Sequence, residues 1–164
     1  MKKVISILIA CMMLFACAFA ETDAAYETVA LETGSVQIYD FGENRLHAYV
    51  SGDALGDTCY AIESPEGVVL LESTAFAANN AEWKDYVTSL NKPVAGKLMA
   101  YHPNGSDTYS ADAPYATENA VANWAEGGSI RALTDGFVAT FGDAVAADHP
   151  ASAQIVAFGE TVSL

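Results

Sequence analysis

The stretch DTCYAIESPEGVVLLEST, residues 57–74, decides the architecture that the rest of the sequence follows. Its two apolar arms, Thr58–Glu63 and Val68–Glu72, are predicted to be strands. The segment Ser64–Gly67 between them carries Pro and, two residues later, Gly, which is hairpin-turn chemistry. Val68–Leu71 is continuously apolar, as is typical of a strand buried on both faces. We therefore predict a hairpin whose second arm lies inside a sheet.

The residues after this hairpin predict a crossover to a parallel neighbour. Asn79 and Asn80 can cap a helix that runs to about Leu90. Four residues three or four apart give this helix one apolar stripe: Trp83, Tyr86, Val87 and Leu90. A proline at position 93 ends it, and Val94–Met99 returns as a strand. Strand, helix and strand in this order favour a right-handed crossover.

Two more strands are expected before the hairpin, at Ser35–Tyr39 and Arg45–Val50. In the second of these, strict alternation would place Leu46, Ala48 and Val50 on the core face. The same alternation would leave His47 and Tyr49 on the opposite face, so that His47 meets solvent.

The second half of the chain predicts two helices and a final hairpin. Thr117 can cap a helix that runs through Trp124, and Ser129 can cap another through Phe141. Residues 154–157 and 161–164 then form a hairpin around a glycine. The two tryptophans, at 83 and 124, lie on helical stripes and are predicted to be core residues rather than platforms for sugar stacking.

The charge of the chain excludes several classes of partner. With 7 basic and 21 acidic residues it carries a formal net charge of −14. Nucleic acid is excluded because a phosphate backbone needs a basic surface. Charge-driven binding to an anionic membrane is excluded for the same reason. We interpret the acidity as a source of solubility.

The first 20 residues have the three parts of a secretory signal peptide. Lys2 and Lys3 precede an apolar run, and small residues at Ala18 and Ala20 allow cleavage before Glu21. The alternatives are a lipoprotein cut before Cys17 and an uncleaved anchor. We expect a secreted, periplasmic or cell-envelope protein that has no membrane attachment after cleavage.

Behind the predicted cleavage site we expect a mobile spacer over residues 21–33 and one domain over residues 34–164. Cys11 and Cys17 lie inside the signal, so Cys59 is then the only thiol and no internal disulfide can form. Cys59 lies in an apolar strand and is predicted to be a buried core residue.

The hairpin of residues 57–74 resembles the early hairpin of metallo-β-lactamase-fold hydrolases, and the helix and strand that follow it keep the order of that family. The resemblance implies an α/β domain of the αββα-sandwich type, of which this chain holds the first half to two-thirds. In the family the Val94–Met99 strand leads into the zinc motif His-x-His-x-Asp-His. Here Ala100, His102, Asn104 and Gly105 stand at its four ligand positions, so the motif is largely lost.

A catalytic zinc ion needs several imidazole and carboxylate ligands to activate water. We therefore interpret His102 as a vestigial metal ligand, with Asp107 as the second candidate ligand. His47 or His149 could complete a site, in which case zinc would be the metal; otherwise we expect no cofactor. A triad of His102, Ser106 and Asp107 is the weaker hydrolytic alternative, because three residues of one short loop rarely reach that geometry.

Three hypotheses for function follow. The chain is a non-catalytic metallo-β-lactamase-fold protein with an eroded zinc site, a fragment of a longer metallo-hydrolase, or an extracytoplasmic binding or interaction module. A half-fold leaves one sheet face uncovered, so we also expect it to pair with a second copy. The substrate class is not fixed by the fold, and whether the chain is an enzyme is left open.

Overall fold

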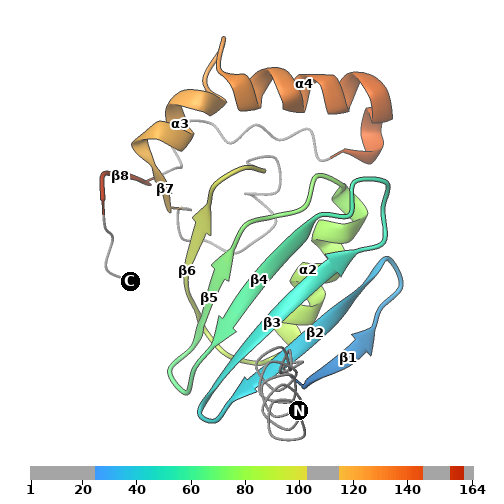
Figure 1. Ribbon diagram of the computed structural model, residues 1–164, viewed down its shortest axis with the longest axis vertical. Helices are drawn as coiled ribbons and strands as arrows, with labels where there is room; N and C mark the ends of the chain where they lie inside the picture. The colour runs from blue at the N-terminus through green and yellow to red at the C-terminus, as the bar shows by residue number, and fades with distance from the viewer. Residues whose placement is uncertain (1–24, 103–114, 146–155, 161–164) are drawn as a thin grey trace, which may run out of the picture.

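The computed structural model describes residues 25–102, 115–145 and 156–160, which form an eight-stranded mixed sheet with helices around it (Figure 1). This confirms the predicted α/β class. The strands are β1 (Tyr26–Ala30), β2 (Gly34–Phe41), β3 (Asn44–Ser51), β4 (Thr58–Glu63), β5 (Val68–Leu71), β6 (Val94–Met99), β7 (Tyr115–Thr117) and β8 (Val156–Phe158). The helices are α2 (Ala77–Ser89), α3 (Glu118–Trp124) and α4 (Ser129–Phe141), followed by a 3-10 turn at Gly142–Ala144.

The strands lie in the sheet in sequence order, and the direction of pairing changes at β5. Strands β1 to β5 pair antiparallel through short turns. Strand β5 then pairs parallel with β6, β6 with β7, and β7 with β8. A parallel neighbour requires a crossover connection, and α2 supplies it between β5 and β6. The predicted hairpin and the predicted strand-helix-strand unit are both confirmed.

Helix α2 lies against one face of the sheet, and we call this the covered face (Figure 1). Its main core consists of fully buried or nearly buried residues, namely Val36, Tyr49, Cys59, Ala61, Val68, Leu70, Trp83 and Val87. The predicted stripe of α2 therefore faces the core, with Trp83 stacked on Tyr86 at 5.5 Å between ring centroids. Trp124 is also buried, in a second cluster with Met99, Ala116 and Ala120. The predictions for both tryptophans and for Cys59 are confirmed.

The other face of β2 to β6 is left uncovered by the described helices, and we call it the open face (Figure 1). Cross-strand pairing places alternate residues on it: Ser35, Gln37, Tyr39, Leu46, Ala48, Val50, Thr58, Tyr60, Ile62, Val69, Leu71 and Leu98. This set of side chains includes no Asp, Glu, Lys, Arg or His. Ile62 is the most exposed of the large apolar ones, at 42%.

The prediction of which face of β3 is buried is wrong. His47 and Tyr49 are 2% and 0% exposed and lie on the covered face, whereas Leu46 and Val50 are only half-buried. Alternation was predicted correctly, but the side chains that pack against α2 are the polar aromatic ones. Val68–Leu71 is likewise buried on one face only, since Val69 and Leu71 belong to the open face.

Residues 26–30 of the predicted mobile spacer are instead strand β1. It pairs with β2 over five residue pairs, and the rings of Tyr26 and Tyr39 lie 5.1 Å apart. Residues 21–24 and the predicted signal peptide lie outside the described residues. This polar segment forms a strand because the edge of β2 offers backbone groups with which Thr28 and Val29 can pair.

The helices begin close to the predicted positions, but two of the three predicted caps are wrong. Thr117 does cap α3, accepting a hydrogen bond from the amide of Ala120 at 3.1 Å. Helix α2, however, begins after Phe76 without a side-chain cap, and Asn79 and Asn80 lie inside it. Helix α4 begins at Ser129 itself, with Gly128 in the capping position.

The first arm of the predicted C-terminal hairpin is found in part, as strand β8. Strand β8 pairs parallel with β7, with Tyr115 opposite Val156. Its expected second arm, residues 161–164, lies outside the described residues. No helix within the described part of the chain is long and apolar enough to cross a membrane.

Candidate functional site

Polar side chains gather where β4, β5 and β6 meet the loops at one end of the sheet. Asp57 precedes β4, Glu72 follows β5, and His102 closes the short segment after β6. The antiparallel start of β4 and the carboxyl ends of the parallel strands β5 and β6 lie at the same end of the sheet. Ligands of open α/β sheets bind at this edge, which makes it the candidate site by position.

The carboxylate of Glu72 holds the segment that follows β6. Its Oε2 accepts hydrogen bonds from the amides of Ala100 (3.1 Å) and Tyr101 (2.8 Å). Its Oε1 accepts from the amides of His102 (2.8 Å) and Ser73 (3.2 Å). Both oxygens are thus engaged, and their partners are backbone groups.

Glu72 also has a left-handed backbone, with φ of 67°. A non-glycine residue in this region costs on the order of 1 kcal/mol or more and persists only where its surroundings enforce it. Here the turn lets the side chain reach the residues after β6, where hydrogen bonds from the amides of three successive residues, 100 to 102, offset the strain.

His102 is held by a partly buried carboxylate, that of Asp57. The side chain is buried, and its Nε2 lies 3.3 Å from Oδ1 of Asp57. The other carboxylate oxygen of Asp57 accepts from the amide of Ala75 at 3.0 Å. Burial alone would raise the pKa of Asp57, but the hydrogen bonds from His102 and Ala75 hold it below its ordinary value. One nitrogen of the imidazole is therefore tied to a carboxylate, and this contact fixes the orientation of the ring.

The predicted ligands are only partly brought together. His102 joins Asp57 and the Glu72 carboxylate, whereas Asp107, Ser106 and His149 lie outside the described residues. Within the described ranges, no three His, Cys, Asp or Glu side chains are grouped as metal ligands would be.

His47, the other described histidine, belongs to a separate network. Its Nδ1 lies 2.8 Å from the hydroxyl of Tyr86, and its Nε2 lies 2.9 Å from Glu63. Lys92 pairs with the same carboxylate at 2.8 Å. Hydrogen bonding to Lys92, and then to His47, lowers the pKa of Glu63. His47 thus fastens α2 to β3 and β4 and is a structural residue.

Sequence reasoning missed Asp57 and the role of Glu72. Both flank the hairpin from which the fold was predicted, Asp57 before its first strand and Glu72 after its second. An acidic residue directly before or after a buried strand is a signal for a group that fixes neighbouring loops, because it meets backbone amides at the end of the sheet.

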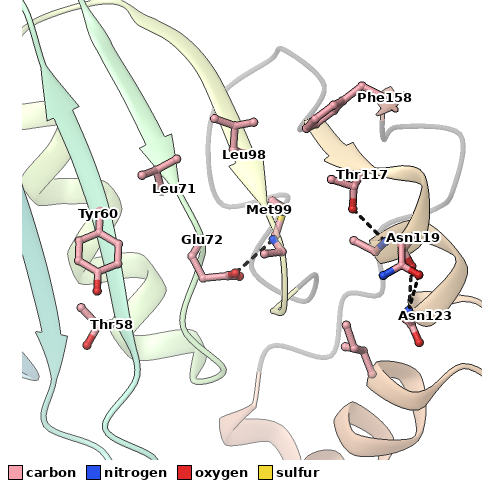
Figure 2. Close-up of a pocket in the computed structure, with 13 residues that line it drawn as sticks. Thr58, Tyr60, Leu71, Glu72, Leu98, Met99, Thr117, Asn119, Asn123 and Phe158 are labelled. Carbon is pink, nitrogen blue, oxygen red and sulfur yellow. Dashed lines mark hydrogen bonds between the residues drawn. The ribbon is translucent and has the colours of Figure 1, made fainter. Parts of the chain in front are cut away.

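A pocket adjoins this network on the open face (Figure 2). Its volume is about 620 Å³. The side chains that line it come from the sheet and from α3 and α4, and they are Thr58, Tyr60, Leu71, Glu72, Leu98, Met99, Ala100, Thr117, Asn119, Ala120, Asn123, Ile130 and Phe158. Figure 2 shows β4 and β5 on one side of it, with β6 in the middle and α3 on the other side.

Comparisons with family models, with curated proteins and with solved structures found no match for this chain. The function is therefore inferred from the residues of the chain itself.

Proposed function

We propose that the protein is an exported, non-catalytic member of the metallo-β-lactamase fold that acts as a binding module. Its polar network at the end of the sheet keeps a ligand pocket in shape, and it performs no hydrolysis. The order of elements supports the family, since an early antiparallel hairpin, a crossover helix and a parallel strand follow one another as the resemblance implies.

The open face supports the same assignment. In an αββα sandwich a second sheet packs on the face of the first sheet that its helices leave free. In this chain α2 covers one face and the described helices leave the other uncovered, which is the arrangement of one αβ half. We therefore include the αββα sandwich of this family in the proposal.

The observation that carries the non-catalytic assignment is the use of Glu72 and His102. A hydrolytic metal ion needs ligand atoms with free lone pairs directed at one point. Both oxygens of Glu72 accept backbone amides, one ring nitrogen of His102 is paired with Asp57, and the described residues bring no group of three ligand side chains together. These side chains therefore hold the loop in place, which fits a binding protein better than a zinc enzyme.

The test is the metal content of the mature protein purified without chelator, measured by inductively coupled plasma mass spectrometry. We expect no stoichiometric zinc, and no turnover of lactam, thioester or phosphodiester test substrates. About one zinc per chain that is lost in His102→Ala but retained in the matched variant His47→Gln would overturn the proposal. Asp107 would then be the next ligand to test.

A second candidate is that the chain is a fragment of a longer metallo-hydrolase, and the uncovered sheet face favours it. The coding DNA beyond the stop codon distinguishes the two. A further reading frame with His-rich motifs would support the fragment, whereas unrelated sequence would support the binding module.

Export and self-association each have a direct test. N-terminal sequencing of the mature protein should begin at Glu21; a start at a lipid-modified Cys17 would identify a lipoprotein, and an intact Met1 would contradict cleavage. Light scattering should give the mass of a dimer if the open face pairs with a second copy, and the mass of a monomer would contradict that expectation.

A further inference from the structure

The pocket of Figure 2 combines a ligand-sized volume with an apolar floor. Binding sites for small molecules usually enclose about 300–1,000 Å³, and about 620 Å³ lies in the middle of that range. The floor is formed by Leu71 and Leu98 of the open face, with Met99 and Ile130 beside them. Contact with an apolar ring or chain would remove this surface from water, which is the main favourable term in such binding.

The two walls of the pocket carry polar groups that have hydrogen-bonding capacity to spare. The hydroxyls of Thr58 and Tyr60 on β4 have no hydrogen-bond partner among the described residues. Across the pocket, the side-chain nitrogen of Asn119 on α3 is also without one. By contrast, Asn123 is engaged, since it donates to the carbonyl of Asn119 and accepts from Ser129. The free groups thus stand on opposite walls, with the apolar floor between them.

The charge of the pocket excludes ionic ligands. Among the described residues that line it, Glu72 is the only acidic one, and none is Lys, Arg or His. The two oxygens of Glu72 already accept four backbone amides, so they offer no partner to a cation. An anion would meet this carboxylate and a chain of net charge −14 without any basic partner.

We propose that this pocket binds one neutral, amphipathic small molecule, with an apolar centre over Leu71 and Leu98 and hydrogen-bonding groups at its two ends. One end meets the hydroxyls of Thr58 and Tyr60, and the other meets the amide of Asn119. This ligand class rests on the proposed function, because a binding module needs a ligand and the end-of-sheet network stabilises one wall of the pocket.

The experiment compares two fluorescent probes that share one ring system. N-phenyl-1-naphthylamine is neutral, and 1-anilinonaphthalene-8-sulfonate adds an anionic group to the same scaffold. Each is titrated into the purified mature protein and followed by its emission. We expect saturable binding of the neutral probe at one site per chain, with the sulfonate weaker by about tenfold or more because its charge has no basic partner.

Three variants locate the site. Leu98→Asp places a charge on the pocket floor and should weaken the neutral probe by about tenfold or more. The matched control is Ile62→Asp, which puts the same charge on the same face but outside the pocket, and binding should stay within about twofold. Ala100→Trp fills the pocket from an exposed position, so it blocks binding without disturbing the core. Near-ultraviolet circular dichroism checks that each variant is folded.

Absence of binding by the neutral probe would overturn the proposal, as would equal binding of the sulfonate. Equal loss in Leu98→Asp and Ile62→Asp would show that the probe covers the open face generally, and this would also overturn it. Zinc content is measured separately. A protein that contains zinc and does not bind the probe contradicts the proposed function as well, whereas a zinc-free protein that does not bind the probe contradicts only the ligand proposal.

Discussion

The two faces of the sheet treat polar groups in opposite ways. On the covered face, the hydroxyl of Tyr49 contacts Thr33, Asn79 and Glu82. Burial raises the pKa of Tyr49 to about 12. On the open face, the hydroxyl of Tyr60 has no partner among the described residues. Polar side chains that bond to one another stabilise the fold. Polar side chains that have no such partner and lie beside apolar ones, as in the pocket, can instead bind a ligand.

The largest expected difference between the faces is in stability. Trp83→Ala removes a fully buried side chain from the covered face and should lower the free energy of unfolding by about 3–5 kcal/mol. Tyr60→Ala on the open face removes a half-buried ring and should cost about 1–2 kcal/mol, since less area leaves water. Chemical denaturation of both variants measures this. Equal losses would mean that the open face is covered in the folded protein.

A smaller effect is expected where the two faces meet at Glu72. Glu72→Ala removes four hydrogen bonds to backbone amides and should cost at least about 2 kcal/mol, since one bond to a charged group contributes about 1.5–3 kcal/mol and the freed amides can turn to water. Glu72→Gly loses the same bonds but relieves the positive φ, so it should be less destabilised by about 1 kcal/mol. The comparison is made by urea titration, and Gly behaving worse than Ala would contradict the strain.

The polar network of the covered face should make stability depend on pH. Burial alone would raise the pKa of Glu82, but hydrogen bonds from Thr33, Tyr49 and Glu32 lower it below the ordinary 4.5. A lowered pKa in the folded state means that the contribution is full above pH 4.5 and is lost as the pH falls through the folded value. Thermal unfolding between pH 6 and pH 3 should therefore show a shallower decline in Glu82→Gln than in the wild type. Identical slopes would exclude Glu82 as a source of the dependence.

The smallest effect is expected at the exposed end of the open face. Ile62→Asp should change the free energy of unfolding by no more than about 0.5 kcal/mol, because the side chain is already 42% exposed. Thermal denaturation at neutral pH tests it against the wild type. A loss comparable to that of Trp83→Ala would place Ile62 in a core.

The sequence predicted the positions of strands and helices better than it predicted which face of a strand is buried. The hairpin of residues 57–74 and the strand after α2 are found where apolar runs and turn residues placed them, because local pattern determines both. The exposure of His47 was predicted wrongly for a physical reason. Alternation separates two faces but does not say which one a helix will cover, and a histidine that finds Tyr86 and Glu63 is as stable inside as an aliphatic residue.

The sequence predicted where the candidate site lies but not which residues form it. His102 follows β6 as expected, yet its partner Asp57 lies 45 residues earlier in the chain and no local pattern connects the two. The pocket was not predicted at all. Its floor and walls come from β4, β5, β6, α3 and α4, and only the folded sheet brings these segments together.

The change of strand direction at β5 has a consequence for how the chain folds. Strands β1 to β5 pair with sequence neighbours through short turns, so each contact closes only a short loop. The parallel strands must wait for α2 and for the longer connections beyond β6. As synthesis proceeds from the N-terminus, the antiparallel meander can assemble first, and the later strands then add one by one, β6 to β5, β7 to β6 and β8 to β7. Amide hydrogen exchange should accordingly be slowest in β3 and β4 and fastest in β7 and β8, which makes the wall that carries Asn119 the part of the pocket that opens most readily.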